Sequence, residues 1–231
     1  MTPEEIRSRL AKSAVKLTAG GFRPTGEPTE SWLGRVFLSG PDEEMPVNSV
    51  GDPLLPLAQI CLASLPFVPA CLEGVALVTV FIGTSLPDEF EPMGEKWIVR
   101  EYSNMADLVQ RDWPSPRSFL NPFPVSFQRI DDEWPCWDGG GLTEEMSDEI
   151  LALEASGEIN DYYDLGEHHY VHKVGGYPSF CQSGIDPGDG FEFAFQISSD
   201  SKINLNVVDG GSLQFYRNPH TAEWKIYYDF Y

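Results

Sequence analysis

The sequence is poor in positive charge, and this shortage restricts the partners that the protein can bind. Its 231 residues include 15 lysines and arginines against 36 acidic residues, so the formal charge is −21. Binding to nucleic acids depends on basic side chains that release counterions from the phosphates, and attraction to anionic membranes needs basic residues too. We therefore expect neither a nucleic acid nor a membrane as a partner, whereas a basic protein would suit this charge.

The sequence also lacks cysteine pairs, a secretory signal and a long uninterrupted apolar run. No two of its four cysteines form a CxxC pair, which favours free, packed thiols in a reducing compartment. Residues 1–17 carry six charged side chains, whereas a secretory signal needs an apolar segment there. Residues 53–72 are uncharged, but Pro56, Pro66 and Pro69 interrupt them, which argues against a membrane helix. We expect a cytoplasmic protein.

Apolar residues are nevertheless abundant, and two helices are predicted among them. They make up 42% of the chain, which is enough for a sizeable core in a single domain over residues 1–231. A capping box that starts at Thr2 precedes apolar residues at helical spacing, which predicts an N-terminal helix over residues 3–19. Thr143 as N-cap and a glycine stop predict a second helix near residues 143–156.

The remaining signals favour strands, and the predicted class is α+β, strand-rich and mainly antiparallel. Short runs rich in β-branched and aromatic residues are separated by Gly, Pro, Asn and Asp, which is typical of strands joined by turns. Residues 113–127 contain four prolines, and we expect them to form a loop or an extended edge. The predicted strands include Val75–Ile82, Trp97–Tyr102, Glu192–Ile197, Ile203–Val208, Ser212–Tyr216 and Glu223–Tyr228.

Two sequence patterns recur at one spacing and predict an internal duplication. Gln59 lies within an apolar predicted strand, and Gln196 lies within another, 137 residues later. Gly74 precedes the next predicted strand of the first copy, and Gly211 precedes its counterpart, again 137 residues later. We therefore expect two duplicated halves packed about a pseudo-twofold axis. The predicted halves are residues 30–82 and 172–217.

Several motifs resemble those of the YwqG-like bacterial proteins, a family of unknown function. The segment from Gly175 to Gln182 reads GGYPSFCQ, which is similar to the GG-x-P…Q signature of that family. The segments around Gln59, Gln196 and Gly211 resemble further family motifs in the same order. The resemblance implies a compact, duplicated α+β fold and no established activity, although such families have been proposed to include immunity proteins of toxin loci. The structural motif residues are Gln59, Gly74, Gly175, Gly176, Pro178, Gln182, Gln196 and Gly211.

The first half departs from the family pattern at the turn that follows Trp32. Gly34 is present there, but Arg35 and Phe37 stand where Gly and Pro would be expected. The resemblance therefore does not extend to a ligand site on the Gly34-Arg35 turn.

Three of the four histidines are clustered at His168, His169 and His172, close to Asp161 and Asp164. A metal site uses two or three imidazoles with a carboxylate. In a helix His168 and His172 would lie one turn apart and could share an ion, whereas in a strand they would lie about 13 Å apart. The residues that follow favour a strand, so we expect structural histidines, no metal and no cofactor. A metal-dependent enzyme that uses His168 and His172 remains the alternative, and the pattern nominates no catalytic residue.

Residues 130–172 form an acidic insert with 13 Asp and Glu residues and no Lys or Arg. Tryptophans and tyrosines lie between the carboxylates. Carboxylates attract a basic partner over a distance, and aromatic rings add rigid contact area. We expect a non-catalytic protein-binding module for a basic partner, for example an immunity-type inhibitor in a toxin locus; a structural or regulatory domain with incidental acidity is the further alternative. The predicted partner-binding residues are Asp131, Asp132, Glu133, Trp134, Trp137, Asp161 and Asp164.

Overall fold

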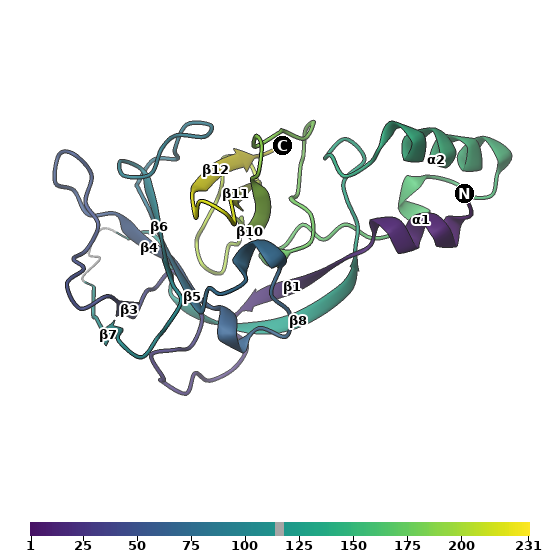
Figure 1. Cartoon of the computed structure of the whole chain (residues 1–231). Helices are drawn as coiled ribbons and strands as arrows, with labels where there is room; N and C mark the ends of the chain where they lie inside the picture. Colours follow the sequence, from purple (N-terminus) through teal and green to yellow (C-terminus); the bar gives the residue numbers. More distant parts are fainter. Residues whose placement is uncertain (114–117) are drawn as a thin grey trace.

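The computed structural model describes residues 1–113 and 118–231, which form a curled antiparallel sheet with two helices packed together beside it (Figure 1). The helices are α1 (Pro3–Leu10) and α2 (Glu144–Ser156), with short 3-10 helices η1 (Leu62–Ser64), η2 (Ala70–Leu72) and η3 (Tyr162–Asp164). The strands of the sheet are β1 (Lys12–Ala19), β2 (Trp32–Leu33), β4 (Leu55–Cys61), β5 (Leu77–Ile82), β6 (Trp97–Tyr102), β8 (Phe123–Glu133), β9 (Lys173–Gly175), β10 (Glu192–Ser198), β11 (Ser212–Arg217) and β12 (Trp224–Asp229). A separate pair consists of β3 (Leu38–Ser39) and β7 (Val109–Gln110).

The strand order is the same on the two sides of a central pair formed by β1 and β8. From β1 the sheet continues through β9, β10 and β11 to β12, and from β8 it continues through β2, β4 and β5 to β6. All these neighbouring strands are antiparallel, as the sequence predicts. The described strands therefore follow one order of pairing in both directions from the centre.

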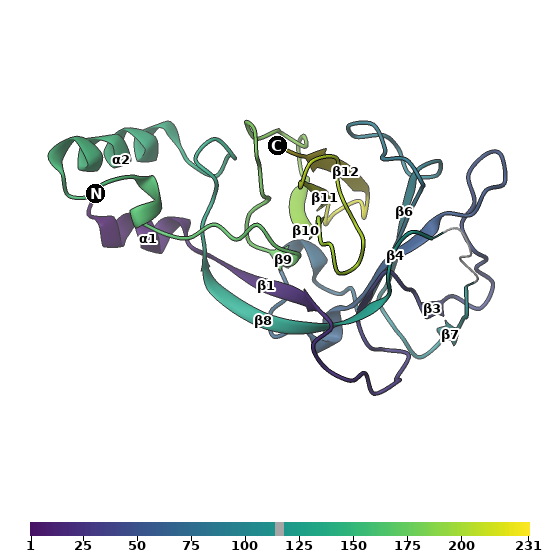
Figure 2. The same ribbon diagram turned by 180° about the vertical axis from the view of Figure 1, so that it is seen from behind.

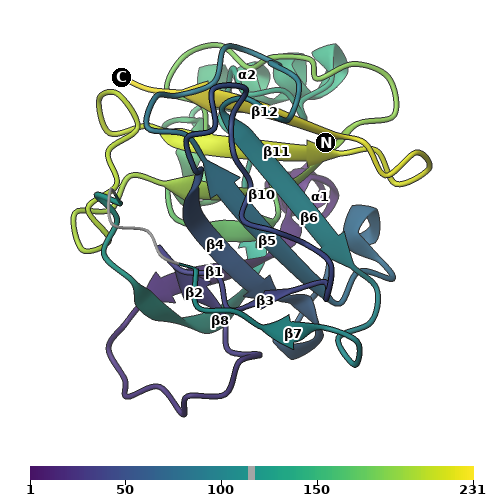
Figure 3. The same ribbon diagram turned by 90° about the vertical axis from the view of Figure 1, so that its left-hand side faces the viewer.

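The sheet curls until its two ends face each other across one apolar core. Trp97 of β6 and Phe215 of β11 meet with ring centroids 6.3 Å apart. Arg217 of β11 forms an ion pair with Glu101 of β6, with a distance of 2.7 Å between Nε and Oε2. Figure 3 shows β11 and β12 running across one end of β4, β5 and β6. The curl covers one face of β4 and β5, and the chain segments around β3 and β7 pack against the other face, so every residue of these two strands is buried. Every residue of β11 is buried as well.

The N-terminal helix is shorter than the sequence predicts. Thr2 forms the expected capping box, but α1 ends at Leu10 rather than at residue 19. Residues 12–19 form β1 instead, with Leu17 in the main core. The apolar spacing fits a helix, but pairing with β8 on one edge and with β9 on the other satisfies this backbone in the sheet, and this tertiary context decides the outcome.

The second helix is confirmed at both of its ends. The hydroxyl of Thr143 accepts a hydrogen bond from the backbone of Met146, and Gly157 ends the helix with a φ of 79°. Its apolar side packs with α1 in a separate small core around Trp134, in which Ile6 and Ile150 are fully buried. Neither α1 nor α2 has both the length and the apolar character that a membrane crossing needs; this statement covers residues 1–113 and 118–231.

Two predictions about strands are wrong. Residues 203–208 form turns with an isolated bridge at Leu205, because this segment reverses direction tightly before β11. The proline-rich segment was expected to be loop or edge, but it contains the start of the eleven-residue strand β8 at Phe123. Pro124 is tolerated there because it is the second residue of β8 and its backbone faces Gly20, just beyond the end of β1, where its carbonyl accepts a hydrogen bond from Gly20. Residues 114–117 of the predicted loop lie outside the described residues.

Candidate functional site

The acidic insert leaves the sheet at the end of β8 and returns to it at the start of β9. We call residues 134–172 the acidic lobe; it carries α2 and η3 and packs against α1. Figure 2 shows these helices to one side of the curled sheet. The lobe contains ten Asp and Glu residues and no Lys or Arg. Its exposed carboxylates are those of Asp138, Glu144, Glu145, Asp148, Glu158, Asp161, Asp164 and Glu167.

A buried ion pair joins the two strands from which the lobe extends. Glu133, the last residue of β8, pairs with the ammonium of Lys173, the first residue of β9, and both side chains are fully buried. His169 Nδ1 lies 2.6 Å from the second oxygen of Glu133. The ammonium of Lys173 also donates to the backbone carbonyl of His169 at 2.8 Å. Burial lowers the pKa of Lys173, and the Glu133 carboxylate opposes that shift.

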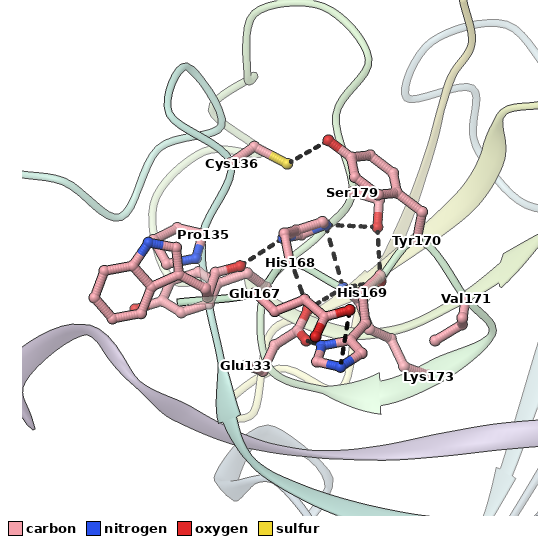
Figure 4. Close-up of polar contacts among 12 residues, drawn as sticks. Glu133, Pro135, Cys136, Glu167, His168, His169, Tyr170, Val171, Lys173 and Ser179 are labelled. Atoms are coloured by element: carbon pink, nitrogen blue, oxygen red, sulfur yellow. Dashed lines mark hydrogen bonds and ion pairs between the residues drawn. The ribbon is translucent and has the colours of Figure 1, made fainter. Parts of the chain in front are cut away.

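His168 extends this network toward Ser179 (Figure 4). Its Nδ1 lies 2.5 Å from the carbonyl oxygen of Trp134, which can only accept, so Nδ1 carries the proton. Its Nε2 lies 2.8 Å from the hydroxyl of Ser179 and accepts from it. Burial, assisted by the positive charge of Lys173, lowers the pKa of His168 to about 3. His168 is therefore neutral at pH 7.

Gln196 completes the network from the neighbouring strand β10. Its Nε2 donates to the Ser179 hydroxyl at 2.8 Å and to the carbonyl of Val171 at 2.9 Å, and its Oε1 accepts from the Ser179 backbone. We call this network the clasp, because it connects the residues just before and just after the lobe. The clasp consists of Glu133, His168, His169, Lys173, Ser179 and Gln196.

The arrangement holds the lobe in place and is poorly suited to catalysis. A serine hydroxyl hydrogen-bonded to an imidazole can serve as an activated nucleophile in other proteins. Here Ser179 is only 3% exposed, and its hydroxyl already accepts from Gln196. A substrate would have no access to that oxygen. Buried, mutually satisfied polar groups of this kind fix one geometry of the surrounding chain.

The histidines do not come together as a metal site. His172 Nδ1 accepts from the backbone of Ser198 at 3.0 Å, and its Nε2 faces Asp200 at 3.2 Å. Burial lowers the pKa of His172, and Asp200 opposes the shift. Both nitrogens of His168 and of His172 thus have protein partners. In the described part of the chain, no three His, Cys, Asp or Glu side chains are placed to hold a metal ion.

The strand predicted after the histidines is confirmed only in part. Residues 168–172 lie outside the strands, and β9 begins only at Lys173. His168 instead makes polar contacts with Trp134 and Ser179, and pairing with β1 starts at His172, whose carbonyl accepts a hydrogen bond from the backbone of Leu17.

The predicted partner-binding residues divide into buried and exposed groups. Glu133 and Trp134 are 0% and 1% exposed, so neither lies on a surface that a partner could touch. Trp137 is half-buried against Tyr162, with ring centroids 4.9 Å apart. Burial of the first two follows from the clasp and from the small core beneath α2. The remaining four, Asp131, Asp132, Asp161 and Asp164, are exposed.

Comparison with known proteins places this architecture in a family. Residues 33–222 match the family described as Domain of unknown function (DUF1963). The chain belongs to the DUF1963 family. No curated protein matches it. The matched DUF1963 region includes the acidic lobe, the whole clasp and both paired glutamines.

The paired glutamines of the DUF1963 region are buried and fully hydrogen-bonded, as expected for amides inside apolar strands. Gln59 Oε1 accepts from the backbones of Phe37 and Leu38, and its Nε2 donates to the carbonyls of Pro28 and Glu30. Gln196 makes the equivalent kind of contacts within the clasp. Each amide therefore fastens loop backbone to the sheet.

The other motif residues shape turns and close approaches. Gly74 has a φ of 81° in the turn before β5, and a Cβ on Gly211 would lie 1.7 Å from the carbonyl oxygen of Asp229. Gln182 donates its side-chain amide to the carbonyl of Phe230, and Pro178 is half-buried. These residues support the fold of the DUF1963 domain.

Sequence reasoning missed Lys173 and Ser179 as members of the clasp. The available signal was a lysine next to Val174 and just before the glycine pair, in a chain with few basic residues. A lysine at such a position needs a buried anionic partner.

Proposed function

We propose that this DUF1963 protein is a non-catalytic binding module whose acidic lobe docks a basic protein. The observation that carries the proposal is the placement of the lobe. Its carboxylates are exposed beside the sheet, it has no Lys or Arg of its own, and the clasp fixes its two ends. A fixed surface of one charge sign attracts an oppositely charged partner and orients it before contact.

The cations nearest the lobe leave most of its charge unneutralised. Arg7 of α1 donates to the carbonyls of Asp164 and Leu165 and lies 3.6 Å from Glu4, a carboxylate of its own helix. The amino group of Met1 pairs with Glu149. Only one lobe carboxylate is therefore taken up by these contacts, and eight others are exposed.

Three exposed side chains give the lobe apolar contact area. Tyr163 of η3 is 51% exposed, Leu151 of α2 is 49% exposed and Tyr170 is 48% exposed. They supply the contact area for a partner that Trp134, which is buried, cannot supply. An aromatic ring with few rotatable bonds adds contact area at low entropic cost.

The proposal is tested by affinity capture with three forms of the protein at low and high salt, followed by mass spectrometry. The lobe variant is Glu145→Gln, Asp148→Asn, Glu158→Gln and Glu167→Gln. The control variant is Asp42→Asn, Glu44→Gln, Glu73→Gln and Glu89→Gln, all exposed and outside the lobe. Both variants lose four negative charges, so net charge alone does not distinguish them.

The expected result is a basic protein that the wild type and the control variant capture at low salt and that the lobe variant releases. Two results would contradict the proposal: all three forms capture the same proteins, or both variants lose the captured protein to the same extent. Either result would mean that the acidic residues serve solubility rather than docking.

We further infer three finer points. The identical strand order on both sides of β1 and β8 supports a duplication of the two halves. The GGYPSFCQ motif supports a place among the YwqG-like members and, through that resemblance, an immunity-type inhibitor as the specific role. Four free cysteines support a reducing, cytoplasmic location.

A further inference from the structure

The two consecutive motif glycines, Gly175 and Gly176, face different neighbours. Both have positive φ, of 74° and 76°. A Cβ on Gly176 would lie 2.6 Å from Cγ of Glu133, so this glycine lets the backbone approach the clasp. A Cβ on Gly175 would point away from the clasp, toward Phe67 and Pro69, with Phe67 Cε1 3.1 Å away. The clasp therefore accounts for the close approach at Gly176, whereas the neighbours of Gly175 lie outside the clasp.

Gly175 borders a cavity of about 500 Å³ that the docking proposal does not use. The cavity lies where β1, β9 and β10 meet the chain around η2, which belongs to the other side of the sheet. Phe67, Pro69 and Phe193 form apolar walls. A side chain on Gly175 would project toward two of these walls, so the glycine keeps the cavity open. The volume falls within the range of small-ligand sites.

One cation and one anion lie at this cavity, on the two strands that flank β9. Lys12 belongs to β1 and Glu192 to β10, and both residues line the cavity. The ammonium of Lys12 lies 4.0 Å from the ring centroid of Tyr177. Within the described residues, neither Lys12 nor Glu192 forms an ion pair. Both charges are thus available to a ligand.

The cavity also contains a thiol, which is not suited to covalent chemistry. Cys71 donates to the carbonyl of Phe193 at 3.6 Å. Burial raises the pKa of Cys71 to about 12, so the group remains a thiol at neutral pH. A protonated, buried thiol is a poor nucleophile. Reversible binding is the chemistry that this cavity supports.

We propose that the cavity binds a small zwitterion with an apolar side chain, the chemical class of a free apolar amino acid. The ligand carboxylate pairs with Lys12, the ligand ammonium pairs with Glu192, and the side chain packs against Phe67 and Phe193. Opposite charges beside apolar walls match both ends and the body of such a molecule. The inference is independent of the docking function of the lobe.

The test is isothermal titration of the full chain with L-phenylalanine as the probe. Two analogues each lack one charge: 3-phenylpropionate has no ammonium, and 2-phenylethylamine has no carboxylate. We expect saturable binding of one phenylalanine per chain, and binding of each analogue weaker by about tenfold or more.

Variants at the two charged residues assign the contacts. Lys12→Gln and Glu192→Gln should each weaken phenylalanine binding by about tenfold or more, because each removes one charge-assisted contact. Lys16→Gln, on the same strand but away from this cavity, and Glu89→Gln, at an exposed position, are the matched controls and should bind as wild type.

Filling the cavity gives an independent readout. Gly175→Ala should abolish binding, but its positive φ makes the variant prone to unfold, so Ala70→Leu at the exposed rim is the second blocking variant. Absence of saturable binding of phenylalanine or leucine at millimolar concentrations would overturn the proposal. So would binding that Lys12→Gln, Glu192→Gln and Ala70→Leu all leave unchanged.

Discussion

The two paired glutamines occupy corresponding positions in the sheet but have different neighbours. Gln59 of β4 lies opposite Trp32 of β2, and Gln196 of β10 lies opposite Lys173 of β9. Trp32 packs edge-on against Phe37, with ring centroids 5.3 Å apart, and its buried indole nitrogen has no partner among the described residues. Lys173 instead pairs with a buried carboxylate.

This difference shows that one backbone arrangement can be stabilised in two chemical ways. Each short strand leads into a turn through a glycine of positive φ, 72° at Gly34 directly after β2 and 74° at Gly175, the last residue of β9. The side with Trp32 relies on apolar packing, and the side with Lys173 relies on ionic and polar contacts. Only the second side connects to the acidic lobe, so the polar chemistry lies where a long insert must be anchored.

The largest expected effect comes from breaking the ion pair on the polar side. Lys173→Met leaves the buried carboxylate of Glu133 without its ammonium partner and should lower the free energy of unfolding by about 3–5 kcal/mol. Trp32→Phe, at the corresponding apolar position, removes no hydrogen bond and should cost less than about 1.5 kcal/mol. Urea denaturation of both variants measures the difference.

A second variant separates charge from packing in this comparison. Glu133→Gln combined with Lys173→Met removes both charges and should recover part of the lost stability. If Lys173→Met alone costs no more than Trp32→Phe, the buried ion pair does not hold the base of the lobe.

The next effect compares the two glutamines directly. Gln59→Leu and Gln196→Leu each leave backbone donors unpaired and should each cost about 1–3 kcal/mol. Gln196→Leu should also increase hydrogen exchange in residues 134–172, because Gln196 is part of the clasp, whereas Gln59→Leu should not. Equal exchange in that segment for the two variants would remove the distinction between the two sides of the sheet.

The last of these effects depends on pH and is specific to the polar side. The pKa of His168 is about 3 in the folded state and about 6.5 in the unfolded state. As the pH decreases, the unfolded chain therefore binds a proton at this imidazole before the folded chain does. Stability from this group is present above pH 6.5 and falls as the pH decreases toward 3, by up to about 1.4 kcal/mol per pH unit. His168→Gln should flatten this dependence between pH 7 and pH 5.

The control for the pH measurement is His220→Gln, because His220 is exposed in a turn. Each variant is compared with its own stability at pH 7. An unchanged slope in His168→Gln would show that the imidazole is not buried as a neutral group.

Local features of this fold could be predicted from the sequence, but the pairing between distant segments could not. The ends of α2 follow from Thr143 and Gly157, since caps depend on a few adjacent residues. Hydrogen bonding of Gln59 and Gln196 follows because an amide inside an apolar strand needs partners. The helical spacing before residue 19, in contrast, was overridden by pairing with β8.

The candidate site shows the same limit. Glu133 appears in the sequence as one carboxylate in an acidic run, and nothing local connects it with Lys173, 40 residues later. Its neighbour Trp134 likewise suggests an exposed aromatic residue but is buried beneath α2. The acidity of the insert was therefore predictable, whereas the division into an exposed lobe and a buried clasp required the fold.

The most direct test of the central claim is the association rate of the captured basic partner, measured at several salt concentrations for the wild type, the lobe variant and the control variant. Electrostatic steering acts mainly on association, and screening by salt weakens it. We predict a lower association rate and a shallower salt dependence for the lobe variant only, with Tyr163→Ala raising the dissociation rate instead. Identical association rates and salt dependence for the lobe and control variants would contradict docking on the acidic lobe.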